Sequence, residues 1–385
     1  MLRILTVSSL YPSAARPHHG VFVETRMRRF RETTGAYVRV IAPVPWFPFK
    51  SSTFGEYAQF ARTPRRETRN GFDVDHPRYL LPPKIGMEIA PAAMARAFIR
   101  DAERIVAEDG PFDLIDAHYY YPDGVAAASL ATRLGLPFVV TARGTDINLV
   151  PGFDRPRRRI LETAEAAAAS ITVCAALKDE MVALGAAPDK IHVLRNGVDL
   201  DLFHPPSERT AGPLKKLVSV GHLIERKGHH LVIEALADLP GCELEIAGDG
   251  PEKAALERLA AERGVADRVT FLGRLSQSDL PAVYGRADAL VLASSREGWA
   301  NVLLEAMACG TPVVATPIWG TPEVVASPAA GRLTEDRSAT AVAAAVTTLF
   351  EGPPSRDDTR AYAERFSWDE TVERMDALFR RVARR

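Results

Sequence analysis

The feature that most constrains this chain is a repeated alternation of short, Val- and Ile-rich apolar runs with longer segments of helical periodicity. Such alternation is typical of βαβ units, in which helices cover a sheet of parallel strands. The pattern runs through two successive series, and 385 residues exceed the usual size of one hydrophobic core. The sequence therefore predicts an α/β chain with two doubly wound, Rossmann-like domains.

The first series predicts six strands and four helices. The predicted strands are Arg3–Ser9, Tyr37–Pro43, Asp113–Ala117, Phe138–Ala142, Ser170–Cys174 and Lys190–Leu194. The predicted helices are Glu24–Thr33, Gly124–Leu134, Pro156–Ala169 and Leu177–Leu184. Residues 46–83 are rich in proline and aromatic side chains, so we expect an irregular insertion there that could hold a hairpin.

The segment Asp199–Pro213 has the composition of a linker, and the second series follows it. Its predicted strands are Leu217–Gly221, Glu243–Ala247, Val269–Leu272, Ala289–Ala293 and Pro312–Ala315. Its predicted helices are His229–Leu236, Glu252–Arg263, Leu280–Tyr284, Asn301–Ala308 and Thr340–Phe350. We place the domains at 1–206 and 207–365, and we expect residues 366–385 to form a helix that returns to the first domain. Doubly wound sheets bind ligands at the carboxyl ends of their strands, so a ligand is expected in the cleft between the domains.

Composition excludes some partners. A formal net charge of −1 gives no reason to expect nucleic acid. Arginine is concentrated in Arg26–Arg31, Arg62–Arg69 and Arg155–Arg159. These segments have two interpretations: solvated helix and loop faces, or a basic surface that contacts anionic lipid or a phosphorylated acceptor.

The three cysteines, Cys174, Cys242 and Cys309, lie far apart in apolar surroundings and are expected to be buried thiols in a reducing compartment. The apolar run near the N-terminus is too short for a signal peptide, and no stretch approaches the length of a membrane span. We expect a cytoplasmic protein, with peripheral contact at the inner face of the membrane as the alternative.

The most specific motif is Ser294–Pro312, SSREGWANVLLEAMACGTP, which follows a predicted strand and enters a predicted helix. Main-chain N–H groups at a helix start have no partner within the helix, so they favour phosphate. Glu297 lies on the turn and Glu305 lies within the helix, so the two carboxylates need not act as one acid–base pair. Glu305 is surrounded by apolar residues and needs a polar partner.

This motif resembles the E-x7-E signature of the retaining glycosyltransferases of family 4, which have the two-domain GT-B fold. Three other segments resemble elements of that family: Gly221–Gly228 its donor-phosphate loop, Val269–Gly273 the strand and turn beside the nucleotide base, and Leu194–Asp199 the P-N-G-V-D element. The resemblance covers nearly the whole chain. In overall style it is closest to bacterial enzymes of cell-surface polysaccharide assembly.

The resemblance implies a role for individual residues at the donor site. Glu297 would be catalytic and contact hydroxyls of the transferred sugar, Glu305 would bind the ribose hydroxyls, and Lys227 would neutralise the diphosphate. The main chain of Gly298, Trp299, Ala300, Asn301 and Val302 would hold the sugar and the phosphates. Arg274, after the base-side turn, is predicted as a further donor contact. Gly248 is either part of a tight turn or a second close approach to the donor.

The chain departs from the family pattern at several positions. His222 stands where an arginine usually assists the lysine, and Arg226 could substitute for it. Arg143 replaces a histidine of the H-G-S-D element, either as a surface residue or as a cation near a phosphate. Only Gly20 remains of the paired glycines before the first helix. His118 matches the second histidine of the H-A-H element, and we predict that it is catalytic beside the scissile bond, with a purely structural histidine as the alternative.

The predicted function is retaining, metal-independent transfer of a hexose-type sugar from a UDP- or GDP-sugar to a glycan or lipid-linked acceptor. We expect no cofactor and no metal, since His18 and His19 have no third ligand at a suitable spacing. The alternatives are a sugar-nucleotide epimerase of the same layout, a glycogen-type phosphorylase, for which no pyridoxal lysine is found, and a non-catalytic subunit that binds nucleotide-sugar. The sequence leaves the sugar, the base, the acceptor and the oligomeric state open.

Overall fold

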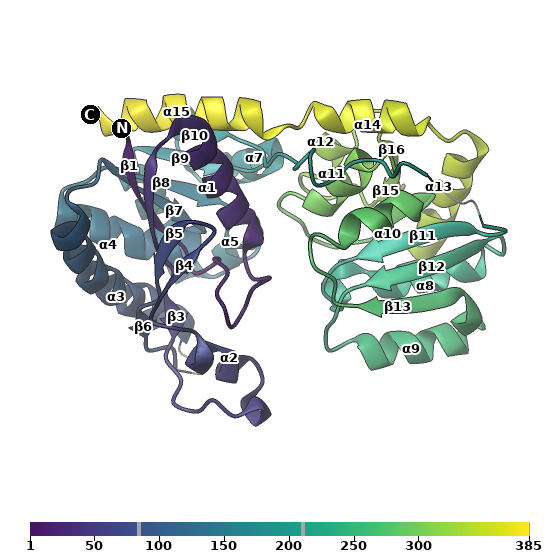
Figure 1. Ribbon diagram of the computed structural model, residues 1–385, viewed down its shortest axis with the longest axis horizontal. Coiled ribbons are helices and arrows are strands. Elements are labelled where there is room, and N and C mark those ends of the chain that lie inside the picture. The colour runs from purple at the N-terminus through teal and green to yellow at the C-terminus, as the bar shows by residue number, and fades with distance from the viewer. Residues whose placement is uncertain (83–85, 209–211, 385) are drawn as a thin grey trace. The chain divides into compact units, whose positions relative to one another are not determined.

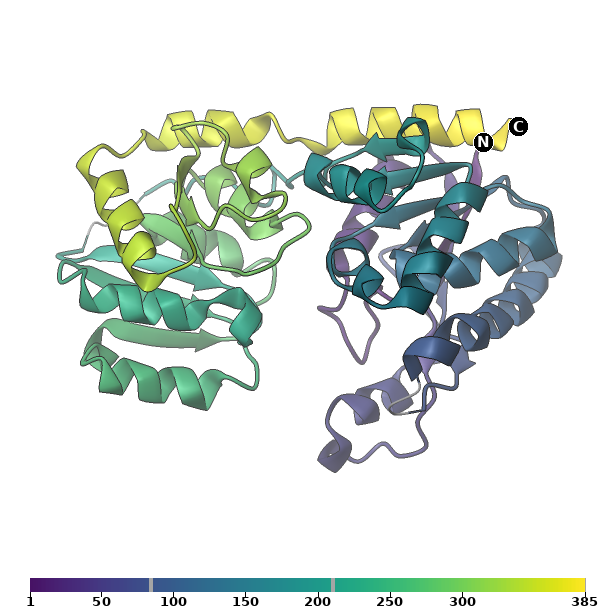
Figure 2. The ribbon, with the colours of Figure 1, turned by 180° about the vertical axis from the view of Figure 1, so that it is seen from behind.

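A computed structural model of the chain describes residues 1–82, 86–208 and 212–384. The chain forms two compact units (Figure 1; Figure 2 shows the reverse side). Unit 1 consists of Met1–Arg195 together with Asp369–Arg385, and unit 2 is the continuous segment Asn196–Trp368.

Unit 1 is built on a sheet with the strand order β10-β9-β8-β7-β1-β2-β5-β4. Its strands are β1 (Arg3–Val7), β2 (Tyr37–Ile41), β4 (Arg66–Arg69), β5 (Phe72–Asp75), β7 (Leu114–His118), β8 (Phe138–Ala142), β9 (Ala169–Thr172) and β10 (Ile191–Val193). All neighbours pair in parallel except β4 and β5. Every residue of β7 and β8 is buried, as expected for central parallel strands covered on both faces.

Unit 1 also contains helices. They are α1 (Val21–Thr34), α2 (Glu56–Arg62), α3 (Gly86–Asp109), α4 (Val125–Leu134), α5 (Thr145–Asn148), α6 (Asp154–Ala166), α7 (Ala175–Ala183) and α15 (Trp368–Ala383). From Asp369 onward, α15 belongs to unit 1, where the rings of Phe30 and Phe379 lie 5.5 Å apart.

The insertion contains more regular structure than its composition indicates. It holds the short pair β3 (Val44–Pro45) and β6 (Arg78–Tyr79), helix α2, and a hairpin in which β4 pairs with β5 around Asn70 and Gly71. Both turn residues have positive φ, 47° and 76°, which a two-residue hairpin turn requires. The hairpin then joins the main sheet, because β5 pairs with β2.

Several sequence predictions are wrong in detail. Helix α3 was not predicted; it contains Pro91, a residue that usually interrupts helices because it has no N–H to donate, but the Met87 carbonyl that it leaves without that donor accepts from Tyr121 Oη at 2.5 Å. The predicted helix 156–169 ends at Ala166, because Ala169 already begins β9. In the segment Arg26–Arg31, Arg26 does not belong to a solvated face, since it is fully buried against Leu194 O and Met375 Sδ.

Unit 2 has a fully parallel sheet in the order β13-β12-β11-β14-β15-β16. Its strands are β11 (Lys215–Val220), β12 (Cys242–Ala247), β13 (Val269–Gly273), β14 (Ala289–Leu292), β15 (Val313–Ala315) and β16 (Gly331–Leu333). Its helices are α8 (His229–Ala237), α9 (Lys253–Glu262), α10 (Leu280–Arg286), α11 (Asn301–Ala308), α12 (Thr321–Val324), α13 (Ala339–Glu351) and α14 (Arg356–Glu364). The two parallel sheets confirm the predicted α/β class.

The end of α11 is held by two arginines of α14. Arg356 donates to Cys309 O at 2.8 Å, and Arg360 donates to Ala308 O at 2.7 Å. Carbonyls at a helix end lack partners within the helix and attract cations, so these side chains anchor the helix that carries Glu305.

The unit boundaries differ from the placement at 206/207 and 365/366: residues 196–206 belong to unit 2, and the chain re-enters unit 1 after Trp368. Part of the expected linker, residues 209–211, lies outside the described residues. All three cysteines are buried and free, as predicted. Among the helices that the structure describes, none has the length and apolar character needed to cross a membrane.

Candidate functional site

In unit 2, the carboxyl ends of β11 and β14 bring Lys227 and Glu297 together. These strands are neighbours in the sheet, and the chain order reverses between them, which is where doubly wound sheets bind ligands. The loop after β11 carries Lys227 and the loop after β14 carries Glu297. Lys227 Nζ lies 2.6 Å from Glu297 Oε1, so two residues far apart in sequence form one ion pair at the switch point.

Glu297 is held by more than Lys227. Ser294 Oγ donates to the same Oε1 atom at 2.8 Å, and Arg226 Nη1 lies 3.9 Å from it. Arg226 also donates to Arg296 O at 2.8 Å. The short helical turn Glu225–Lys227 brings both cations toward Glu297, whereas an extended loop would have separated them. The contribution of Ser294 could not be recognised from the sequence, because a serine after a strand has no distinctive signal.

Glu305 lies on α11 and is almost fully buried. Its Oε2 atom accepts a hydrogen bond from Tyr284 Oη at 3.0 Å, which is the polar partner that its apolar surroundings required. Burial raises the pKa of Glu305 to about 7, although the Tyr284 hydrogen bond lowers it. Tyr284 was missed by sequence reasoning, since only the fold places α10 beside α11.

The segment 298–302 is anchored through its side chains. Trp299 Nε1 donates to Asn196 O at 3.1 Å, the Trp299 ring lies 6.1 Å from that of Phe366, and Asn196 Nδ2 donates to Asn301 Oδ1 at 3.3 Å. These contacts fix the loop that leads into α11. A donor contact through the main chain of this segment stays a prediction.

His222, Gly248 and Arg274 surround Asp249, on the loop after β12. His222 Nδ1 lies 2.5 Å from Asp249 O, and Arg274 Nη2 lies 3.6 Å from Asp249 Oδ2. Gly248 packs against the main chain of Gly221: an added Cβ would lie 1.8 Å from Gly221 O. This contact explains why glycine is needed there without any ligand. The Asp249 carboxylate also offsets part of the positive charge that Arg274 would offer to a phosphate.

In unit 1, the carboxyl ends of β7 and β8 bring His118 and Arg143 together. Arg143 Nη2 lies 2.6 Å from His118 Nδ1, and His118 Nε2 lies 2.9 Å from Asp116 Oδ2. Since a guanidinium only donates, Nδ1 must accept, which leaves the His118 proton on Nε2 facing Asp116. Burial, opposed by Asp116 and reinforced by Arg143, lowers the pKa of His118 to about 4. The imidazole is therefore neutral near pH 7.

The burial of His118 limits what it can touch. Its relative exposure is 0%, and both ring nitrogens face other side chains, so the predicted contact with a sugar requires a displacement of Arg143. Arg143 is not a simple surface cation, because burial and the neighbouring Arg26 lower its pKa to about 9. Asp116, between these two arginines and His118, was not singled out from the sequence.

Gly20 lies at the start of α1 with φ 68°, and an added Cβ would lie 2.3 Å from Leu10 C. A side chain there would collide with the loop Ser9–Gly20, so Gly20 permits that loop to close on α1. The same loop is tied to the end of β7, because Asp123 Oδ2 accepts from Ser9 Oγ at 2.9 Å. Contact of Gly20 with a donor stays a prediction.

Replacing Arg143 with methionine tests the proposed tautomer of His118. In the unchanged protein, nitrogen NMR should show a neutral ring protonated at Nε2 from pH 5 to 8. In Arg143→Met, loss of the neighbouring cation should raise the His118 pKa and free Nδ1 for protonation. Arg133→Met, which removes an exposed arginine, is the control. An identical His118 titration in all three folded proteins would refute the coupling.

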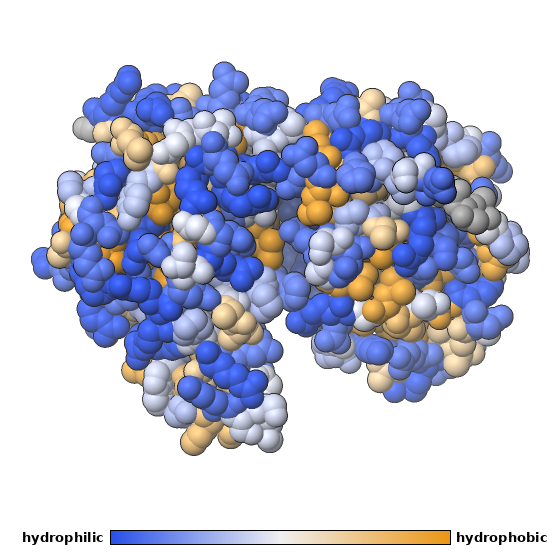
Figure 3. All heavy atoms as spheres, viewed as in Figure 1, coloured by the Kyte–Doolittle hydropathy of each residue, from blue (hydrophilic) through white to orange (hydrophobic). Residues whose placement is uncertain are grey.

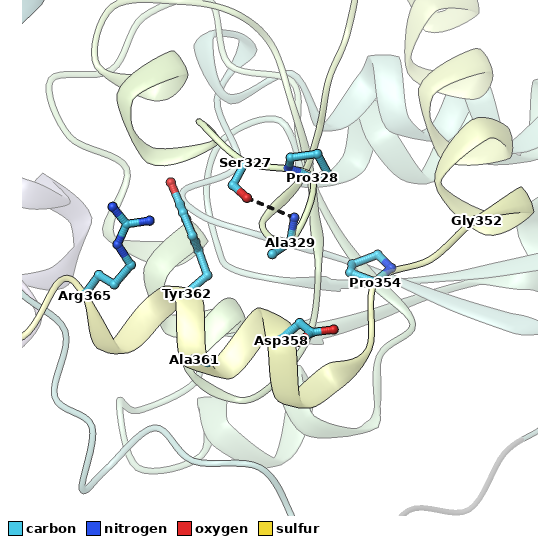
Figure 4. A pocket seen from close by; sticks show the side chains of 9 residues that line it. All are labelled: Ser327, Pro328, Ala329, Gly352, Pro354, Asp358, Ala361, Tyr362 and Arg365. Atoms are coloured by element: carbon cyan, nitrogen blue, oxygen red, sulfur yellow. Dashed lines mark hydrogen bonds between the residues drawn. The ribbon is translucent and has the colours of Figure 1, made fainter.

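A separate hollow of about 550 Å³ lies in unit 2 between α14 and the loop Ser327–Ala329 (Figure 4). It is lined by Ser327, Pro328, Ala329, Gly352, Pro354, Asp358, Ala361, Tyr362 and Arg365. None of the predicted site residues lines it. Within residues 1–82, 86–208 and 212–384, no group of three or more His, Cys, Asp or Glu side chains is placed to hold a metal ion.

The fold and the paired loops define the class of protein. Residues 14–202 match the family model described as Glycosyltransferase Family 4, and residues 203–366 match that described as Glycosyl transferases group 1. The chain belongs to glycosyltransferase family 4. D-inositol 3-phosphate glycosyltransferases of Mycobacterium tuberculosis and Mycobacterium bovis are 32% identical to it over 305 residues. This match covers 72% of the chain and 63% of each relative's length.

Solved structures confirm the GT-B fold. Sucrose-phosphate synthase from Thermosynechococcus elongatus matches 99% of the chain with a TM-score of 0.82 at 20% identity, and 99% of its own length is covered. HepE of Anabaena, solved in complex with UDP-glucose, matches 98% with a TM-score of 0.73 at 20% identity, and 99% of it is covered. At 20% identity, these matches show the fold alone.

Proposed function

We propose that this chain transfers a hexose-type sugar, with retention, from a UDP- or GDP-sugar to an acceptor hydroxyl, and that it needs no metal. The observation that carries the proposal is the Lys227–Glu297 pair at the switch point of unit 2, 2.6 Å apart, with Glu305 on the helix that follows Glu297. A cation and a carboxylate at the strand ends where this fold class binds nucleotides, with a second carboxylate on the helix that follows, support the proposal.

The three side chains would divide the donor between them. Lys227 would neutralise the diphosphate, the carboxylate of Glu297 would accept hydrogen bonds from the sugar, and Glu305 would accept them from the ribose. The carboxylate of Glu297 neutralises the charge of Lys227. A diphosphate would add further negative charge, and Arg226, 3.9 Å from Glu297, is close enough to help neutralise it.

The reaction would break the bond between the anomeric carbon and the β-phosphate oxygen, and the electron pair would leave with the diphosphate. An acceptor hydroxyl would attack from the same face and pass its proton to a phosphate oxygen, which preserves the configuration. Stabilisation of the departing charge by Lys227 and by main-chain amides of 298–302 is the main catalytic contribution of unit 2. The proposed role of His118 beside the scissile bond requires that Arg143 leaves its ring.

A glycan or lipid-linked molecule is the proposed acceptor, in polysaccharide or glycolipid synthesis at the cytoplasmic face of a membrane. The relatives named as acting on D-inositol 3-phosphate make a phosphorylated polyol a further acceptor to include in a screen. An epimerase or a non-catalytic subunit remains the alternative, and turnover distinguishes them: an epimerase alters the sugar without an acceptor, and a non-catalytic subunit binds without turnover.

A panel of UDP- and GDP-sugars, measured by thermal shift with and without chelator, tests the proposal. The correct donor at about 100 times its Kd should stabilise the protein by about 2.7 kcal/mol, roughly 5–10 °C for a unit of this size. Chelator should leave the shift and subsequent transfer unchanged. The nucleosides uridine and guanosine, which lack the diphosphate and the donor sugar, are the controls. Failure of every nucleotide-sugar to shift the melting temperature would overturn the assignment.

A further inference from the structure

Large apolar side chains are exposed very unevenly. Of the described residues, unit 2 exposes no large hydrophobic side chain, whereas unit 1 exposes eleven. Nine of these fall within three segments: Trp46, Phe49, Phe54, Tyr57, Leu80, Met87, Ile89, Leu149 and Phe153. Exposed apolar residues gathered in this way mark a surface that binds something, whereas scattered ones need no explanation.

The insertion around α2 is the centre of this surface. The Phe47 ring contacts three other rings, with centroid distances of 5.9 Å to Phe49, 5.3 Å to Phe54 and 5.2 Å to Tyr57. Although these rings pack on one another, Phe49 remains 56% exposed and Tyr57 remains 48% exposed. Both ribbon views show α2 and its flanking loop projecting from the sheet of unit 1, and Figure 3 shows apolar atoms among polar ones there. The cluster is therefore an apolar projection without a covering layer.

The three segments are joined by direct contacts. Trp46 N donates to Tyr79 O at 2.7 Å, which places Leu80 beside the insertion. Met87, at the start of α3, accepts from Tyr121 Oη at 2.5 Å, and the next residue, Glu88, is ion-paired with Arg155 at the start of α6. We call these three segments the docking surface: residues 46–65, residues 80–82 with 86–89, and residues 149–158.

The docking surface is also basic. Its exposed charged side chains are six cations, Lys50, Arg62, Arg65, Arg155, Arg157 and Arg158, and three acids, Glu56, Glu88 and Asp154. Two of the acids are paired with arginine, Glu56 with Arg16 at 2.7 Å and Glu88 with Arg155. An excess of cations beside exposed aromatic rings complements a layer that is negatively charged at its surface and apolar beneath it.

We propose that the docking surface binds the headgroup layer of an anionic lipid membrane. The rings of the insertion would enter the interface, where aromatic side chains are favoured, and Arg157 and Arg158 would contact lipid phosphates. The exposed rings and arginines come from two segments, 46–65 and 149–158, and the exposed residues Leu80, Met87 and Ile89 add apolar surface between them in the sequence. The insertion projects from the sheet (Figure 1), which favours an extended layer over a peptide as the occupant. This proposal rests on the proposed function at a membrane and identifies the surface of the chain that would contact the lipid. Its failure can be distinguished from failure of the proposed function, because lipid binding is measured without donor and donor binding is measured without lipid.

Flotation with vesicles tests this proposal. The full chain should float with vesicles of phosphatidylcholine containing phosphatidylglycerol and much less with phosphatidylcholine alone. Arg157→Gln with Arg158→Gln should reduce binding roughly 30-fold, at about 1 kcal/mol for each arginine. Phe49→Ser with Phe54→Ser should reduce it at least about tenfold, because each exposed ring loses apolar contact area. All variants should keep the thermal shift with the donor.

Val182→Ser and Arg133→Gln are matched controls, since both side chains are exposed on unit 1 outside the docking surface. Both should float as the unchanged protein does. Two results would overturn the proposal. One is equal flotation of both double variants and the controls. The other is a dimer that forms without lipid and is lost in Phe49→Ser, which would assign the surface to a second copy of the chain.

Discussion

Lys227→Ala should weaken transfer by roughly 100- to 1000-fold, the usual effect of removing one group that stabilises a developing negative charge. The reason is that Lys227 reaches the switch point on a loop fixed by the turn Glu225–Lys227, and no other lysine is paired with Glu297 among the described residues. Titration with the nucleoside diphosphate and with its nucleoside separates the causes. Affinity for the diphosphate should fall strongly, and affinity for the nucleoside should stay within about twofold.

Lys253→Ala is the matched control, because Lys253 is an exposed lysine of unit 2 whose Nζ atom lies 3.9 Å from Glu257 Oε1 on the same helix. It should leave both affinities unchanged. Lys227→Arg should keep part of the diphosphate affinity, since it retains the charge but changes its geometry. Equal losses for nucleoside and diphosphate in Lys227→Ala would show that the lysine supports the fold of the loop rather than the phosphates.

Glu305→Gln should make nucleotide binding weak and nearly independent of pH. In the unchanged protein, burial raises the Glu305 pKa to about 7, and ribose hydroxyls would donate to the ionised carboxylate. Affinity should therefore fall about tenfold per pH unit below pH 7, and binding near pH 6.5 should release a proton. Calorimetry in two buffers of different ionisation enthalpy measures that release. Proton-independent binding in the unchanged protein would contradict the assignment of Glu305 to the ribose.

The same substitution should increase stability. A carboxyl whose pKa is higher in the folded protein than in the unfolded chain favours folding when protonated. Its effect on stability therefore becomes less favourable as the pH rises from 4.5 to about 7, and stays so above that. At pH 8, Glu305→Gln should raise the free energy of unfolding by up to about 3 kcal/mol. Denaturant unfolding at pH 5 and pH 8 measures the difference, and Glu335→Gln, an exposed glutamate of unit 2, is the control. Lower stability of Glu305→Gln at both pH values would sink this account.

The elements best predicted from sequence are those whose pattern and burial agree. Strand 138–142 and helix 301–308 have the predicted bounds. Every side chain of the strand is buried, so its apolar run marks both ends, and the helix begins directly after the loop that carries Glu297. Helix α3 was missed because Pro91 and the preceding irregular region conceal its periodicity. The local sequence pattern therefore predicts elements whose ends are marked by a change of residue type. It fails where a helix tolerates a proline.

The candidate site was predictable in its residue types and less so in its contacts. The pairing of Lys227 with Glu297 follows from the strand order, in which β14 lies beside β11 although β12 and β13 intervene in the chain. The Tyr284 bond to Glu305 and the Asp116–His118–Arg143 contacts depend on distances between separate elements. No spacing rule along one sequence encodes these distances. The burial of His118 is the same kind of result, because its charged neighbours Asp116, Arg143 and Arg26 come from separate elements.

The route of the chain has a consequence for how the protein is made. Unit 2 is continuous, and its two ends meet, because Val198 N donates to Phe366 O at 2.9 Å. Unit 1 is interrupted in the sequence by unit 2. Arg26 and Phe30 make their contacts with Met375 and Phe379 only after those residues have been synthesised. During synthesis on the ribosome, unit 2 has its entire core before the last helix of unit 1 has emerged. Unit 1, although it begins earlier in the chain, thus completes its core after unit 2, and a ribosome that stops before residue 369 releases a chain with a complete unit 2 and an open unit 1.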